Sequence, residues 1–546
     1  MSFMISFLLT ILRTTNKISK IFIKLMIFQG KGFSKMYNKI DKRDVIIILC
    51  LFMLAFLTKL PTINYPVMGD SAIYAELTES ITYNHTYSSP ISFGNNLPHD
   101  KYPPLYPLSS SIFLILSKNV VLSLKLSTIL WSSLAIVLVY LFSRKIKFNR
   151  FESIVTSLLV LFNPWLFYFA GVNACSEGLA VFLIMLGILM FMFRKNKICY
   201  AVSGLSFGLA VLARYPSAVF LLPFLIYCFI MLLKRENIRD NLTFVFLSIL
   251  PIAVWIMRNL LVLNKILPKT YTSEGILFDR SLFYLISNLA KQLFVITPAA
   301  LTILFPFAVI GIAIIFKEKK LIWKLFLAGC CINYFFFSWW YVVGGITVML
   351  RYIVLTIPLL TVLSIKGLFS IKRISYNTKK IIMAITLIMF IFATMFINYG
   401  FFKDKTDNII KFRPIYTQKS YHRAQAISWI NTNVPENSII VTRFYDVDLM
   451  RGIDQCIPPL LRADLEYTII EHDFEPHLKQ YFLSDRLKEN KDYLNQKEIY
   501  FISELNAAES KKAITKEINQ SLTLEEMFKS KQDPIVYIYK IHKNKV

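Results

Sequence analysis

Long apolar runs recur along most of this chain, and short polar connections separate them. About eleven of the runs have the length and composition expected of helices that cross a lipid bilayer. They cover about residues 45–60, 122–142, 154–170, 178–193, 201–212, 217–233, 244–261, 293–316, 321–341, 352–363 and 381–397. A soluble protein of 546 residues could not bury so many apolar segments. The pattern therefore predicts a mainly helical, polytopic membrane protein.

One further apolar run, residues 105–117, follows directly on Pro103 and Pro104. It is too short to cross a hydrocarbon core of about 30 Å, so we expect it to lie on or dip into the outer membrane surface. With this choice, every second connection between spans is densely basic, as cytoplasmic connections are. The N-terminus is then cytoplasmic and the C-terminal tail lies outside. Counting residues 105–117 as a span would turn those basic connections outward.

The polar stretches divide the chain into three parts. Residues 1–42 mix apolar residues with Lys and Arg and are expected to form a basic, amphipathic segment, with a true start at Met36 as the alternative. Residues 43–400 form the transmembrane domain. Residues 401–546 contain short runs rich in β-branched and aromatic residues, which alternate with helical periodicity, and predict an extracytoplasmic α/β domain.

The charge distribution argues against a nucleic-acid partner, and the cysteine spacing argues against a disulfide-bonded or zinc-binding fold. The net charge of +27 would suggest nucleic acid for a soluble protein, but much of the Lys and Arg lies in short connections, where it sets membrane topology. We therefore expect no nucleic-acid partner. The seven cysteines show no paired spacing, which argues against a disulfide framework or a zinc knuckle.

Candidate chemistry gathers in residues 64–104, the longest polar insertion before the tail. Its ionisable side chains include Asp70, Glu76, Glu79, His85, His99, Asp100 and Lys101. Ile73, Leu77 and Ile81 recur every fourth residue, which predicts a short surface helix that starts at Asp70. Asp70 then either caps this helix or acts as a general base at the membrane surface.

The other acidic and histidine side chains of this loop have plainer interpretations. Glu76 and Glu79 are expected on the solvated face of the predicted helix. His85, His99 and Asp100 could bind a divalent metal ion, although their spacing matches no standard site. The metal requirement is therefore left open by the sequence.

The proline pair at the end of the loop holds the chain extended. Lys101 and Tyr102 come directly before it and therefore lie just above the short apolar run that follows. Lys101 either binds a phosphate group or is an interfacial lysine whose ammonium reaches toward water.

Four further charged residues lie at the outer ends of apolar runs under this topology: Glu177, Arg214, Arg258 and Arg351. The centres of the runs carry almost no charge, whereas ion-coupled transporters usually keep ionisable residues near the midplane. This pattern favours an enzyme that acts on the head group of a lipid. Each arginine either binds the lipid phosphate or anchors a helix end. Glu177 contacts the acceptor, a metal ion, or neither.

Six segments, taken in order, resemble the C-type membrane glycosyltransferases, and most closely the branch of protein O-mannosyltransferases and the aminoarabinose transferase of lipid A. They are GDSAIYAELTESI, KYPPLYPLSSSIFLIL, NPWLFYFAGVNACSEGLAVFL, GLAVLARYPSAVFLLPFL, PIAVWIMRNLLVLNKILP and RYIVLTIPLL. The resemblance implies an inverting, nucleotide-independent transfer of a sugar from a polyprenyl phosphate, with Asp70 as the base and Lys101 on the lipid phosphate. Family members often have a second acidic residue directly after the base, where this chain has Ser71.

We therefore predict a multi-pass glycosyltransferase of the cell membrane that moves a monosaccharide from a polyprenyl-phosphate donor to a hydroxyl of a lipid, glycan or protein. The catalytic candidates are Asp70 and Glu177. The candidates for substrate binding are Lys101, Tyr102, Arg214, Arg258 and Arg351. The alternatives are a lipid-linked saccharide transporter or polymerase, and a non-catalytic scaffold of the cell envelope.

Overall fold

The structure is a computed structural model, and it describes most of the predicted transmembrane region and short parts of the tail. The described residues are 41–64, 70–88, 98–99, 102–193, 196–264, 282–318, 321–340, 351–399, 401–403, 410–412, 429–430, 432–435, 439–442, 466–469, 499–503, 522–529 and 537–543. The predicted N-terminal segment lies outside these residues, apart from its last two positions.

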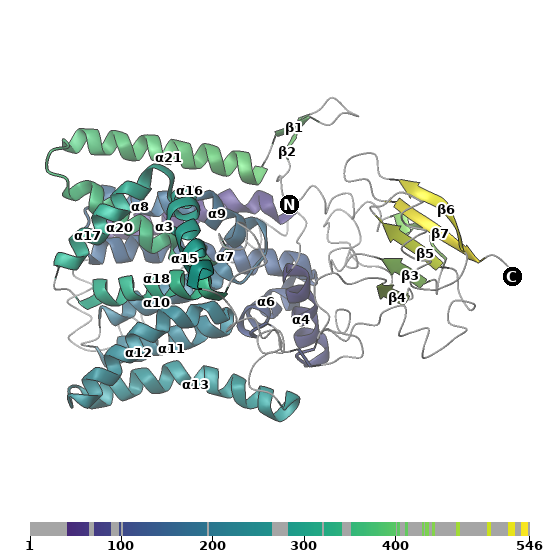
Figure 1. Cartoon of the computed structure of the whole chain (residues 1–546), viewed down its shortest axis with the longest axis horizontal. Coiled ribbons are helices and arrows are strands. Elements are labelled where there is room, and N and C mark those ends of the chain that lie inside the picture. Colours follow the sequence, from purple (N-terminus) through teal and green to yellow (C-terminus); the bar gives the residue numbers. More distant parts are fainter. Residues whose placement is uncertain are drawn as a thin grey trace.

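Helices run side by side through most of the described chain (Figure 1). The principal ones are α3 (Lys42–Lys59), α7 (Val120–Lys145), α8 (Arg150–Leu161), α10 (Glu177–Phe191), α11 (Lys197–Ala213), α12 (Ala218–Leu233), α13 (Ile238–Leu263), α15 (Leu282–Lys291), α17 (Phe305–Lys317), α18 (Leu321–Trp340), α20 (Ile357–Ser370) and α21 (Tyr376–Tyr399). Each apolar run that the sequence predicts as a span coincides with helix. The prediction of a mainly helical fold is confirmed.

The described helices differ in how well they could cross a membrane. Seven helical stretches are long and apolar enough, and an eighth arises if α8 and the short α9 (Pro164–Phe167) form one span with a bend of 58°. Shorter apolar helices include α6 (Leu105–Ser117), α10 and α11. The exact number of spans and the direction of the termini stay predictions.

Helices α4 (Asp70–Asn84) and α6 lie at one end of the bundle, which we call the site end (Figure 1). One side of α6 packs against α7, and there the Tyr106 hydroxyl lies 2.6 Å from the hydroxyl of Thr128. Its other side exposes Leu108, Ile112 and Ile115. A helix of this length spans only about 20 Å, which supports the prediction that α6 does not cross the membrane.

Small residues allow several helix pairs to approach closely. A side chain at Gly311 would overlap the carbonyl of Leu363, and one at Gly367 would overlap that of Phe307, so the backbones of α17 and α20 are in contact. Gly204 and Gly208 bring α11 against α13 in the same way. Close backbone approach is the usual means of helix packing in lipid, where apolar side chains gain nothing by leaving the hydrocarbon.

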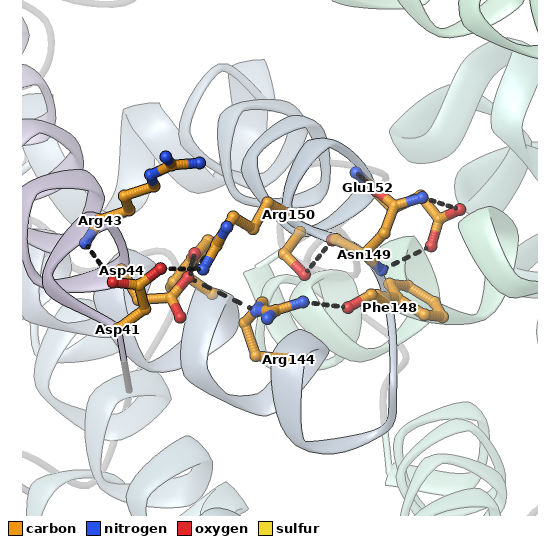
Figure 2. Close-up of polar contacts among 10 residues, drawn as sticks. Asp41, Arg43, Asp44, Arg144, Phe148, Asn149, Arg150 and Glu152 are labelled. Atoms are coloured by element: carbon orange, nitrogen blue, oxygen red, sulfur yellow. Dashed lines mark hydrogen bonds and ion pairs between the residues drawn. The ribbon is translucent and has the colours of Figure 1, made fainter. Parts of the chain in front are cut away.

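The opposite end of the bundle is joined by an ion-pair cluster (Figure 2). Asp44 of α3 is buried, accepts hydrogen bonds from Tyr140 at 2.6 Å and Arg150 at 3.1 Å, and lies 3.6 Å from Arg144. Arg150 also bonds Asp41 at 2.8 Å. The arginines that the sequence assigns to cytoplasmic topology therefore also join α3, α7 and α8.

The described parts of the tail include a mixed sheet with strand order β4-β3-β5-β7-β6. Its strands are β3 (Ile439–Thr442), β4 (Glu466–Ile469), β5 (Ile499–Ser503), β6 (Leu522–Lys529) and β7 (Tyr537–Lys543). Strand β3 is parallel to β4 and β5, whereas β7 is antiparallel to β5 and β6. Strands β3, β5 and β7 lie in short runs rich in β-branched and aromatic residues, which the sequence predicts for this part of the chain. Most of the connecting residues lie outside the described ones, so the α/β domain itself stays a prediction.

Candidate active site

Arg351 joins two carboxylates that come from distant parts of the chain. Its Nη1 donates to Oδ2 of Asp70, and its Nε donates to Oε1 of Glu177. Arg351 begins the apolar stretch Arg351–Ser370, whereas Asp70 and Glu177 are the first residues of α4 and α10. The unpaired N–H groups of a helix start favour negative charge there, so both carboxylates lie where a helix start stabilises them.

A second arginine completes this arrangement. Nη1 of Arg214 lies 2.8 Å from Oε1 of Glu177. The Glu177 side chain is fully buried, and that of Arg214 is only 9% exposed. A buried carboxylate needs such partners, because an unpaired charge away from water is costly. Asp70, Glu177, Arg214 and Arg351 therefore form one unit of two negative and two positive groups, which we call the charge cluster.

Tyr102 occupies the other oxygen of Asp70. Its hydroxyl donates to Oδ1 at 2.6 Å. The ring of Tyr102 stacks on that of His99, with centroids 5.5 Å apart, and its backbone N–H donates to Nε2 of His99. Burial, together with the adjacent Asp70 carboxylate, raises the pKa of Tyr102 well above its usual value. The hydroxyl therefore stays protonated and remains a donor to Asp70.

Three buried atoms of the charge cluster have no hydrogen-bond partner among the described residues. They are Oε2 of Glu177, Nε of Arg214 and Nη2 of Arg351. An unsatisfied buried polar group costs about 1–3 kcal/mol, and more when it is charged. The two guanidinium groups thus have donors that an incoming anion would satisfy.

The structure brings together five of the predicted site residues and places a sixth, Arg258, against the neighbouring loop. Asp70, Tyr102, Glu177, Arg214 and Arg351 meet at the site end. Lys101 lies outside the described residues.

Arg258 contacts the loop that carries Tyr102. Its guanidinium donates to the carbonyls of His99 at 2.9 Å and Tyr87 at 3.2 Å, and it lies 5.0 Å from the centre of the Trp255 ring. These contacts join the end of α13 to the main chain of the loop between α4 and α6.

The remaining loop residues give a correction and an open point. Glu76 is buried, with 1% exposure, so the prediction of a solvated position is wrong for it; Glu79 is partly exposed. Among the described residues, no group of three or more His, Cys, Asp and Glu side chains is placed to bind a metal ion. Asp100 lies outside those residues, and Nε2 of His99 already accepts a hydrogen bond.

A set of small polar contacts beside Asp70 was not predicted. Ser71 donates to Oδ1 of Asn173 at 2.9 Å and lies 3.3 Å from Sγ of Cys175, while Tyr74 and Ser176 share a hydrogen bond at 3.0 Å. The partners are about a hundred residues apart in the chain, and each side alone has the composition of an ordinary helix start. The one signal in the sequence is that Ser71 directly follows the candidate base, where family members often have an acidic residue.

Comparison with known proteins shows a partial family match and a shared fold. Residues 101–257 match the family of dolichyl-phosphate-mannose-protein mannosyltransferases. The fold resembles that of ArnT from Cupriavidus metallidurans, solved with bound undecaprenyl phosphate, with a TM-score of 0.60, 12% sequence identity, and coverage of 91% of this chain and 97% of ArnT. The chain is therefore similar to this family over residues 101–257, and it shares the fold of ArnT over most of its length. This confirms the resemblance seen in the sequence.

A second solved structure has a similar fold. The mycobacterial arabinofuranosyltransferase AftD matches with a TM-score of 0.51 and 15% identity, over 92% of this chain and 40% of AftD. No curated protein matches the chain in sequence. The family match covers Tyr102, Glu177 and Arg214, whereas Asp70 precedes it and Arg351 follows it.

Proposed function

We propose that this protein is a membrane glycosyltransferase that moves a monosaccharide from a polyprenyl-phosphate donor to an acceptor hydroxyl at the site end, with inversion at the anomeric carbon. The bridge from Asp70 through Arg351 to Glu177 carries the proposal, because it sets a carboxylate directly beside a guanidinium group. The donor class is supported by the dolichyl-phosphate-mannose family match and by the undecaprenyl phosphate bound to ArnT.

In this mechanism Asp70 takes the proton of the acceptor hydroxyl while its oxygen attacks the anomeric carbon. The new bond joins the acceptor oxygen to that carbon, and the bond from the carbon to the phosphate oxygen breaks. The polyprenyl phosphate leaves with one more negative charge. Arg351 and Arg214 offer it buried donors that lack partners among the described residues.

Glu177 has a different part in this proposal. Its side chain is fully buried and one of its oxygens lies between two guanidinium groups. A group enclosed in this way is poorly placed to receive a proton from an acceptor. We assign Glu177 a positioning role: it holds the guanidinium groups of Arg214 and Arg351 toward the phosphate.

The remaining predicted residues are assigned by their surroundings. Arg258 donates to two main-chain carbonyls of the outer loop, so we assign it the support of that loop and of Tyr102. Lys101 is proposed to contact the lipid phosphate, as the resemblance implies. Residues 401–546 are proposed to form an extracytoplasmic domain beside the acceptor, with the N-terminus in the cytoplasm.

The donor class is tested with purified protein in lipid vesicles. Radiolabelled polyprenyl-phosphate sugars, with nucleotide sugars as the comparison, are incubated with the protein, and loss of each donor is followed. The proposal predicts cleavage of one polyprenyl-phosphate sugar and of no nucleotide sugar. Cleavage of a nucleotide sugar alone would refute the proposal, as would movement of an intact lipid-linked sugar across the bilayer without cleavage.

A further inference from the structure

A seam of four buried residues and one partly exposed residue joins α4 to the connection before α10. We define this seam by Ser71 and Tyr74 on α4, and by Asn173, Cys175 and Ser176 opposite them. Ser71, Cys175 and Ser176 are fully buried, and Tyr74 is 1% exposed. Ser71 and Tyr74 are three residues apart, so they lie on one face of α4 and make two successive contacts.

The seam joins residues that are sequence neighbours of the two carboxylates of the charge cluster. Ser71 directly follows Asp70, and Ser176 directly precedes Glu177. Arg351 contacts both carboxylates at once, and it can do so only if the starts of α4 and α10 keep one separation. The hydrogen bonds of the seam join the same two helix starts and therefore maintain that separation.

We propose that the seam positions Asp70 relative to Arg351 and Glu177, and that Ser71 is a positioning residue for the transfer reaction. This inference rests on the proposed function, in which Asp70 is the base. It also gives a physical reason for the departure from the family pattern at the position after the base.

A second carboxylate would be unfavourable at position 71. Burial raises the pKa of the Cys175 thiol to about 12, so the thiol stays neutral beside Ser71. A carboxylate would be enclosed there with Cys175 and the amide oxygen of Asn173 as neighbours, and with Asp70 as the preceding residue. A buried anion without a cationic partner is costly, whereas a serine hydroxyl donates to Asn173 and costs little.

The geometry of the seam is tested by cross-linking, without any measurement of activity. In Ser71→Cys, the introduced thiol faces Cys175, and mild oxidation should join the two in a disulfide detected by mass spectrometry of a digest. Ser80→Cys, on the same helix but away from the seam, is the matched control and should form none with Cys175. Absence of the disulfide from folded Ser71→Cys would overturn the proposed contact.

The positioning role is tested by kinetics on a polyprenyl-phosphate mannose that the wild type cleaves. Ser71→Ala should lower kcat about tenfold, since small misplacements of reacting groups have large effects, while binding of undecaprenyl phosphate is unchanged. Ser80→Ala removes a buried hydroxyl that bonds Thr86 and Ser88, and should leave kcat unchanged.

A second variant keeps the positioning role testable if Ser71→Ala folds poorly. Tyr74→Phe removes only the hydroxyl that contacts Ser176, and should lower kcat in the same direction. Wild-type kcat in folded Ser71→Ala, or in Tyr74→Phe, would overturn the positioning role. Failure of the wild type to cleave any donor is a separate result, because it would refute the proposed function while the cross-link still reports on the seam.

Discussion

Arg351 and Asp70 form a direct ion pair although 281 residues separate them in the chain. The same guanidinium also contacts Glu177, so one side chain connects the starts of α4, α10 and the stretch Arg351–Ser370. This relationship makes the site a product of the folded bundle, since none of its helices carries both a base and its cationic partner.

Loss of the Arg351 charge should weaken both binding and transfer. Arg351→Gln removes a donor from the leaving phosphate, and we expect kcat/KM to fall by about 100-fold or more. Arg351→Lys should retain only part of the wild-type kcat/KM, because an ammonium group cannot reproduce the two-nitrogen contact of the guanidinium group with Asp70 and Glu177. The measurement is donor cleavage together with binding of undecaprenyl phosphate. Arg235→Gln, at an exposed arginine, is the matched control; equal effects of the two glutamine variants would contradict the assignment.

Glu177→Gln should cost stability and activity together. Removing one member of a buried ion pair leaves its partners uncompensated, at about 3–5 kcal/mol. We expect a lower Tm in detergent and a lower kcat. Undecaprenyl phosphate should bind more weakly than to the wild type, because Glu177 no longer holds Arg214 and Arg351 toward the phosphate. Equal or tighter binding in a folded variant would contradict this positioning role.

Tyr102→Phe isolates the hydrogen bond to Asp70. Removal of a neutral donor from a carboxylate should lower kcat by about tenfold. The pKa of Tyr102 is raised, so its hydroxyl keeps its proton as the pH rises toward the usual tyrosine pKa of about 10. The ratio of wild-type to variant kcat should therefore be constant from neutral pH up to that value. A ratio that falls to one on the alkaline side would show that Tyr102 ionises in this range.

Asp44→Asn should affect stability without affecting chemistry. Asp44 accepts from Tyr140 and Arg150 at the end of the bundle opposite the charge cluster (Figure 2). Its neutralisation should lower Tm because the buried Tyr140 and the partly exposed Arg150 lose a charged acceptor. The kcat per folded molecule should match the wild type, as shown by donor cleavage normalised to folded protein on gel filtration. A lower kcat at unchanged Tm would mean that this end of the bundle also acts on the site.

The helices could be predicted from the sequence because a membrane span depends on local length and apolar content. The length of residues 105–117 and the charge of the connections between spans separate this run from the spans, and α6 has that extent in the structure. The number of spans depends on helices such as α10 and α11, which are shorter than a usual span. For these helices, local composition does not decide whether the helix crosses the membrane.

The candidate site could be predicted as a set of residues at one end of the bundle, but not as a set of pairs. Asp70, Glu177, Arg214 and Arg351 are all candidates from the sequence, which does not show that Arg214 and Arg351 contact Glu177 while Arg258 contacts a loop. The error at Glu76 has a related cause. Helical periodicity describes the face a helix must bury, and it does not report what the rest of the protein places against the other face.

The most direct test of the account is donor cleavage by Asp70→Asn, with binding of undecaprenyl phosphate measured on the same preparation. The change keeps the size of the side chain and its ability to accept from Tyr102, but removes the base. We predict a loss of kcat of at least about 100-fold, the usual contribution of general base catalysis, with phosphate binding retained. Wild-type cleavage by folded Asp70→Asn would contradict the account and remove Asp70 from the mechanism.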